Sequence, residues 1–122
     1  GASDVVGKPI AVMLMRPAAT VGSCNKHTGG IEDLARSADV LVAAAGVEGL
    51  VTRDWIKPGA VVVDVGIHRR LDARGKKRTF GDVRFDEVRE IASWISPVPG
   101  GVGPMTVATL LENVVSAAEA DR

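Results

Sequence analysis

Apolar positions along this chain alternate between two spacings, one typical of helices and one typical of buried strands. Helical spacing predicts helices from Gly7 to before Pro17, from Ile31 to near Ser37, over one turn at Thr52–Ile56, and over Phe85–Ala92. Short apolar runs predict strands at Thr20–Cys24, Val40–Ala43, Val61–Val65 and Trp94–Ile95. A single apolar stripe from Val107 to Ala118 predicts a last helix that runs to the end of the chain.

Short strands that alternate with helices predict an α/β fold. We expect a Rossmann-like, doubly wound, mostly parallel sheet flanked by helices, which forms one domain over residues 1–122. The runs Val40–Ala43 and Val61–Val65 do not alternate with polar residues, as is typical of strands covered on both faces. Such a sheet opens with a strand that leads into a glycine turn, and here Gly1 stands where that strand should end. We therefore expect the first strand to be missing from this chain and to lie upstream.

Composition and charge limit the kinds of protein and partner that fit this sequence. Apolar residues make up 46% and charged residues 25% of the chain, as in ordinary globular domains. Fifteen basic and fifteen acidic residues cancel, so no net field favours nucleic acid or an acidic membrane surface as a partner. No apolar run approaches the roughly 20 residues that cross a bilayer. The lone Cys24 predicts no internal disulfide and no metal site, and it favours a reducing, cytoplasmic compartment.

One segment is locally basic. Between His68 and Arg78, six basic side chains accompany a single acidic residue, Asp72. Gly75 and the lack of apolar periodicity predict a solvated loop or hairpin. A loop that contacts an anion is the alternative.

The segment Gly1 to Gly7 has features of a phosphate-binding turn. A glycine at a strand end allows a tight turn, small residues allow close approach of a pyrophosphate, and a later glycine allows close helix packing. The N–H groups that begin the following helix would face the anion. Ser3 stands in place of the usual middle glycine, and the last glycine is displaced along the chain. A glycine-rich loop that merely turns is therefore the alternative.

The end of the predicted second strand bears on the choice of dinucleotide. NAD-binding domains place a carboxylate there, whereas this chain has Lys26 and no acidic residue between Cys24 and Glu32. A lysine attracts the 2′-phosphate of NADP, so the charge favours NADP over NAD. An ordinary solvated lysine is the alternative. His27 and His68 are interpreted as surface histidines without a catalytic role.

The segment Pro97–Thr106 contains three prolines and three glycines but no charged residue. This composition excludes the interior of a strand or helix and predicts a loop that offers backbone groups and flat apolar surface to a ligand. We expect Pro104 at the entry of the last helix and Thr106 in its first turn, with a hydroxyl free to bond a ligand or the backbone. A purely structural elbow is the alternative.

Several segments, taken in order along the whole chain, resemble the bifunctional methylenetetrahydrofolate dehydrogenase/cyclohydrolase family. They are Gly1–Pro9, Ala38–Val42, Asp54–Ile67, Gly81–Val83 and, most specifically, Pro97–Thr106. The resemblance implies the cofactor domain of an enzyme that oxidises methylenetetrahydrofolate with NADP, with NAD left open, and hydrolyses the product to formyltetrahydrofolate. It also implies a homodimer and a folate site shared with a separate N-terminal domain. That domain holds the family's catalytic lysine and tyrosine, and this chain, which has no tyrosine, is expected to hold no catalytic residue.

The resemblance also implies which residues of this chain bind the cofactor. The turn residues would contact the phosphates, Lys26 the 2′-phosphate, and the loops after the later strands the nicotinamide half and the folate. The full set is Gly1, Ala2, Ser3, Lys26, Ala44, Gly46, Ile67, Pro99, Gly100, Gly101 and Thr106. This chain departs from the family at Ala2, where arginine is usual, and at Lys26, where serine is frequent.

Two other functions stay open on the sequence. The fold alone also suits the dinucleotide domain of a different NAD(P)-dependent dehydrogenase, against which the segment Pro97–Thr106 argues. A nucleotide-binding or dimerisation module without catalysis is the third reading, supported only by Ala2 and Lys26.

Overall fold

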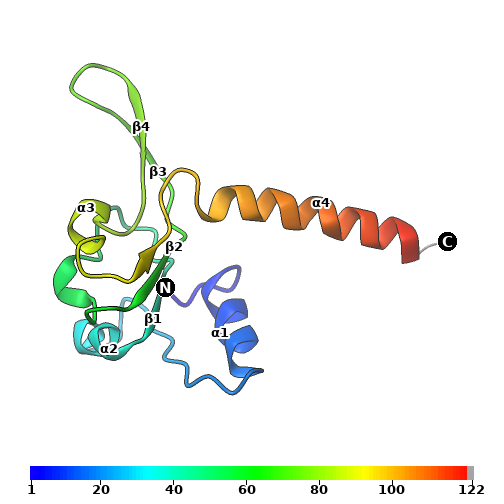
Figure 1. Cartoon of the computed structure of the whole chain (residues 1–122), viewed down its shortest axis with the longest axis horizontal. Helices are drawn as coiled ribbons and strands as arrows, with labels where there is room; N and C mark the ends of the chain where they lie inside the picture. Colours follow the sequence, from blue (N-terminus) through cyan, green and yellow to red (C-terminus); the bar gives the residue numbers. More distant parts are fainter. Residues whose placement is uncertain (121–122) are drawn as a thin grey trace.

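A computed structural model describes residues 1–120 and places a parallel three-stranded sheet at the centre of the chain (Figure 1). The strands are β1 (Val40–Ala43), β2 (Val61–Asp64) and β5 (Trp94–Ile95), in the order β1-β2-β5. Val40 pairs with Val61, and Val61 pairs in turn with Trp94. Parallel neighbours require crossover segments, which the helices between the strands supply. The Rossmann-like α/β fold predicted from the sequence is therefore confirmed.

Helices form where the apolar spacing predicted them. The structure has α1 (Gly7–Met15), α2 (Ile31–Ser37), the 3₁₀ turn η1 (Arg53–Trp55), α3 (Phe85–Val88) and α4 (Val102–Ala120). Only α3 is clearly shorter than predicted. Beyond Val88 the carbonyl of Ile91 accepts a hydrogen bond from Gly59 N (2.8 Å), and Ser93 N donates to Ala60 O (2.9 Å). The segment after α3 is thus bonded to the loop before β2 instead of continuing as a helix.

The last helix begins earlier than predicted, at Val102 instead of near Pro104, so the exclusion of helix from Pro97–Thr106 was wrong for the second half of that segment. Pro104 lies in the first turn of α4, where a missing N–H costs nothing. The last helix continues as predicted to Ala120, and the final two positions of the prediction lie outside the described residues.

The prediction of a strand at Thr20–Cys24 was also wrong. This segment pairs with no other part of the described chain, and a strand requires a hydrogen-bonded neighbour. Strand β1 likewise has β2 as its one partner among the described residues. Val40 is 53% exposed for that reason, although the apolar run predicted full burial.

The basic segment forms the hairpin that was one of its two predicted conformations. Strands β3 (His68–Leu71) and β4 (Lys77–Phe80) pair antiparallel, with His68 opposite Phe80. The turn is closed by Asp72 N, which donates to Lys76 O (2.9 Å), and by Gly75, whose φ of 71° suits a glycine. Figure 1 shows this hairpin projecting from the body of the molecule.

An aliphatic core forms around the sheet and includes residues of β1 and β2. Its buried members are Ala43, Val51, Ile56, Ala60, Val62, Val83 and Val88. Helix α4 stands apart from this core and projects from one side of the molecule, with its apolar side chains exposed (Figure 1). None of the helices within residues 1–120 combines the length and apolarity that crossing a membrane requires.

Candidate functional site: the carboxyl edge of the sheet

The carboxyl ends of β1 and β2 lie at one edge of the sheet, because the strands are parallel. Ligands of open α/β sheets bind outside this edge. Three loops leave it, after β1, β2 and β5, and they carry most of the residues predicted to bind a cofactor. These are Ala44, Gly46, Ile67, Pro99, Gly100 and Gly101.

The predicted phosphate turn packs directly against the loop after β1. A Cβ built on Gly1 would lie 2.1 Å from Ala44 O and 3.0 Å from Ala45 Cα, so the backbones touch there. A Cβ on Gly7 would lie 1.8 Å from Gly1 O. Glycine is therefore required at both positions by close backbone approach, and the structure brings Gly1, Gly7 and Ala44 together as the turn hypothesis expects.

Ser3 organises the start of α1 in this turn. Its Oγ accepts hydrogen bonds from Val6 N (3.2 Å) and Gly7 N (3.4 Å), and its carbonyl accepts one from Lys8 N (2.9 Å). By contrast, the amides of residues 2–5 donate to no group of the described chain. Free N–H groups beside a helix N-terminus fit a phosphate, because they supply both hydrogen bonds and a favourable dipole.

A cavity of about 370 Å³ opens beside the carboxyl end of β2. Five of the predicted residues line it together, namely Ile67, Pro99, Gly100, Gly101 and Thr106. The Val98–Pro99 peptide is cis, and Gly100 has a φ of 101°. Thr106 Oγ1 donates to Val102 O within α4 (3.1 Å), and its oxygen can still accept a hydrogen bond from a ligand. The cavity walls are mostly apolar, as flat heterocyclic ligands prefer.

Lys26 lies apart from these groups. It is exposed at the tip of the turn Asn25–Thr28, which is closed by Thr28 N donating to Asn25 O (2.9 Å). Within residues 1–120 its side chain makes no hydrogen bond or ion pair. Its ammonium is thus available to an anion, and its role toward a 2′-phosphate stays a prediction.

A buried network of polar groups behind the site was missed by the sequence analysis. Asp82 is fully buried, and its Oδ2 accepts hydrogen bonds from Ala45 N (2.6 Å) and Gly46 N (2.9 Å). Its Oδ1 lies 2.7 Å from His68 Nε2. The interpretation of His68 as a surface histidine was therefore wrong, since its side chain is mostly buried against this carboxylate. The one available signal was an aspartate that follows a glycine, Gly81, at the end of a strand.

Asp64, at the end of β2, is the second carboxylate of this network. Its Oδ1 accepts hydrogen bonds from Gly66 N and Asp82 N, and its Oδ2 accepts one from Val83 N (3.0 Å). Asp64 N in turn donates to Ser96 Oγ (2.7 Å). Burial raises the pKa of the Asp64 carboxyl against the opposing effect of these backbone donors. The two carboxylates together tie the loops after β1, β2 and β4, and the backbone amide of Asp64 adds the loop after β5 through Ser96.

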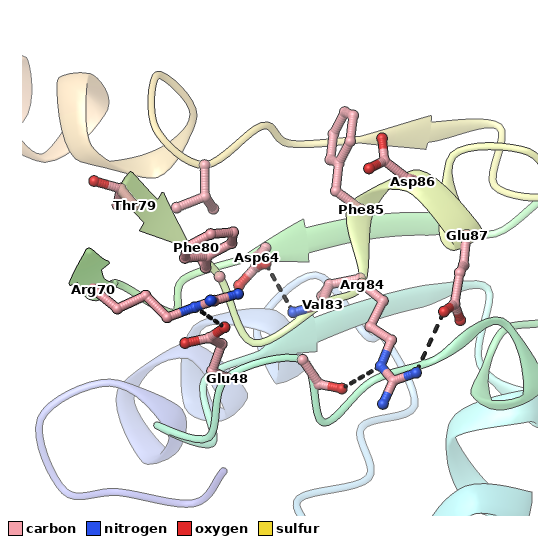
Figure 2. A pocket seen from close by; sticks show the side chains of 13 residues that line it. Glu48, Asp64, Arg70, Thr79, Phe80, Val83, Arg84, Phe85, Asp86 and Glu87 are labelled. Atoms are coloured by element: carbon pink, nitrogen blue, oxygen red, sulfur yellow. Dashed lines mark hydrogen bonds and ion pairs between the residues drawn. The ribbon is translucent and has the colours of Figure 1, made fainter. Parts of the chain in front are cut away.

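A second cavity, of about 440 Å³, lies between the β3–β4 hairpin and α3 (Figure 2). Arg70 crosses it, 4.2 Å from the centre of the Phe80 ring and 3.0 Å from Glu48 Oε1. Arg84 donates to Gly49 O and pairs with Glu87. Both guanidinium groups are thus engaged within the protein. No group of three histidine, cysteine or acidic residues in the described part of the chain could hold a metal ion.

Comparison with known proteins identifies the family. The model of the tetrahydrofolate dehydrogenase/cyclohydrolase NAD(P)-binding domain matches residues 1–122. This chain belongs to that family. Bifunctional protein FolD of Gluconobacter oxydans is 55% identical over 120 residues, which are 98% of this chain and 40% of that protein. FolD of Cupriavidus necator is 55% identical over 119 residues, 98% of this chain and 41% of that protein.

Solved structures of relatives agree with the fold. FolD methylenetetrahydrofolate dehydrogenase/cyclohydrolase of Campylobacter jejuni superposes with a TM-score of 0.91 at 48% identity, over 100% of this chain and 42% of that one. The Trypanosoma brucei enzyme, complexed with NADP cofactor and inhibitor, gives 0.90 at 43% identity, over 99% and 42%. The chain therefore has the fold of an NAD(P)-binding domain and spans about two fifths of the length of these relatives.

Proposed function

We propose that residues 1–122 are the dinucleotide-binding domain of a longer, bifunctional enzyme of one-carbon metabolism. That enzyme would oxidise methylenetetrahydrofolate with NADP and hydrolyse the methenyl product to formyltetrahydrofolate. The printed names of the relatives and the NADP in the Trypanosoma brucei complex support this proposal. The observation that carries it is the glycine turn packed on the loop after β1, at the same sheet edge as the mostly apolar cavity.

In this proposal, one group of residues binds the phosphates of the dinucleotide and another group binds its nicotinamide half. The amides of Ala2 and Ser3, with the start of α1, would hold the phosphates, and Gly1, Ala44 and Gly46 would allow their close approach. Ile67, Thr106 and the segment Pro99–Gly101 would hold the nicotinamide half and the edge of the folate. Bound NADP would supply the hydride acceptor.

We assign no catalytic residue to this chain. Hydride transfer needs the two reactants held in contact, and binding the dinucleotide in a fixed position is the contribution we propose for these residues. Proton transfer would belong to the lysine and tyrosine that the family resemblance places in a separate domain, together with most of the folate site.

Lys26 supports NADP over NAD as the cofactor. Its exposed ammonium, unpaired within residues 1–120, is attractive to a dianionic 2′-phosphate, and the turn Asn25–Thr28 carries no acidic side chain that would repel one. NAD stays open as a weaker ligand. We further propose a homodimer and a cytoplasmic location, the latter because the single Cys24 is free.

Titration with each dinucleotide tests this function. Isothermal calorimetry on the 122-residue chain should give saturable binding of NADP, with weaker binding of NAD. The same chain should not turn over methylenetetrahydrofolate until a folate domain that contains Tyr-x-x-x-Lys is supplied. Robust turnover by the chain alone would contradict the proposed division of labour, and failure to bind either dinucleotide would contradict the function itself. Light scattering after gel filtration tests the dimer.

A further inference from the structure

The buried carboxylate of Asp82 does more than fill space in the core, because it forms hydrogen bonds with two separate segments of the chain. It is completely buried, yet both oxygens are used: Oδ2 by the amides of Ala45 and Gly46, and Oδ1 by the ring of His68. A buried carboxylate with three hydrogen bonds fixes the groups around it, because moving any of them would leave a buried charge unsatisfied. Asp82 thereby fixes the two amides that follow Ala44.

These two amides belong to the loop on which the phosphate turn rests. Gly1 approaches Ala44 O and Ala45 Cα so closely that no Cβ would fit between them. Gly7, at the start of α1, touches Gly1 in the same way. A shift of the loop after β1 would therefore displace the turn and the first residues of α1, since there is no space to absorb it.

The other carboxylate oxygen of Asp82, Oδ1, connects the loop after β1 to the segment after β2. His68 begins β3 and directly follows Ile67, which lines the cavity beside β2. The hydrogen bond from His68 to Asp82 thus connects the segment after β2 with the loop after β1 through one side chain. Both segments are places where, on the function proposed above, the dinucleotide is held.

We propose that Asp82 is a positioning residue for dinucleotide binding, which sets the loop after β1 against the phosphate turn and couples it through His68 to Ile67. This inference rests on the proposed function. It assigns Asp82 no contact with the cofactor, and it predicts that the geometry of its hydrogen bonds, more than its charge, determines affinity.

Two substitutions at position 82 separate geometry from charge. In Asp82→Asn the side-chain oxygen can still accept from Ala45 and Gly46, and its NH₂ can donate to His68, whose neutral ring presents an acceptor in one tautomer. Asp82→Ala leaves both amides without a partner. We expect Asp82→Ala to raise the dissociation constant for NADP by about tenfold or more, and Asp82→Asn to stay within about threefold of the parent chain.

A matched control excludes general destabilisation. Ile56→Val trims the core beside η1 and leaves the carboxylate network untouched, so it should lower the thermal midpoint without changing the dissociation constant. Calorimetry would be run on all four proteins at a temperature at which each is folded by circular dichroism. Amide hydrogen exchange at Ala45 and Gly46 should accelerate in Asp82→Ala alone.

The outcomes distinguish this inference from the function on which it rests. Tight NADP binding by the parent chain with equally tight binding by Asp82→Ala would overturn the positioning role and leave the function standing. Equal losses in Asp82→Asn and Asp82→Ala would also overturn it, because charge would then decide. If the parent chain binds no dinucleotide, both proposals are wrong.

Discussion

Gly81 lies so close to Asp64 that no side chain fits between them. A Cβ built on Gly81 would stand 1.8 Å from Asp64 Oδ2 and 2.5 Å from its Cγ. This approach allows the amides of Asp82 and Val83 to donate to the Asp64 carboxylate. The glycine is thus required by the hydrogen bonds of its two successors, and it connects the end of the hairpin to the end of β2.

The substitution Gly81→Ala is expected to destabilise the protein by about 2 kcal/mol or more, because the new methyl group must push Asp64 or its donors apart. Urea unfolding measures the loss. Gly103→Ala is the control, since a Cβ there meets nothing within 4 Å and alanine favours the helix α4. Equal stability of the two variants would show that the backbone can relax at position 81.

The hydrogen bonds of Asp72 predict that the hairpin turn loses stability in acid. The backbone amides of Lys76 and Arg74, and then Arg78, hold the pKa of the Asp72 carboxyl below its ordinary value. A carboxyl whose folded pKa is depressed contributes stability above its unfolded pKa, and this contribution is lost as pH falls through the folded value. The turn should therefore loosen below about pH 4. Amide exchange of Arg74 and Lys76, corrected for intrinsic rates, reports the change.

The variant Asp72→Asn separates this titration from other effects of acid. Its side-chain oxygen can still accept from both amides, but it does not ionise. Protection of the two amides in Asp72→Asn should accordingly show little dependence on pH between neutrality and pH 3 or so. The same acid response in both proteins would assign the loosening to another group.

Charge reversal at Lys26 tests the choice of cofactor. Lys26→Glu would place a carboxylate near a phosphate if NADP binds there, but near a hydroxyl if NAD binds. We expect the ratio of the NADP to NAD dissociation constants to rise by about tenfold, chiefly through weaker NADP binding. Lys77→Glu, an equivalent reversal on the exposed strand β4, should leave the ratio unchanged. A ratio unmoved by Lys26→Glu would refute the role assigned to this lysine.

Local sequence patterns predicted most helices and strands of this fold. Helix α2, strand β2 and the hairpin were all predictable, because apolar spacing and turn residues act over a few positions. The errors at Thr20–Cys24 and Val40 have a common cause. Pairing and burial of a strand depend on a neighbour that its own residues do not specify.

Some residues of the candidate site were likewise predictable from the sequence, and others were not. The glycine turn and the segment Pro97–Gly101 were found because glycine and proline mark special backbone geometry in the sequence itself. Asp64 and His68 carry no such mark, and at Asp82 the adjacent Gly81 was the one signal. Their roles arise largely from contacts across 14 to 37 residues of chain, which only the folded structure reveals.

The substitution Gly7→Ala tests the phosphate turn most directly. A Cβ at position 7 would lie 1.8 Å from Gly1 O and 2.9 Å from Ala2 Cα, so the turn must move away from α1. We expect a loss of about 1–3 kcal/mol in unfolding free energy, as for other overpacked sites, and at least tenfold weaker NADP binding by calorimetry. Gly29→Ala, where a Cβ meets nothing within 4 Å, should change neither quantity. Unaltered affinity in Gly7→Ala would place the phosphates elsewhere on the sheet edge.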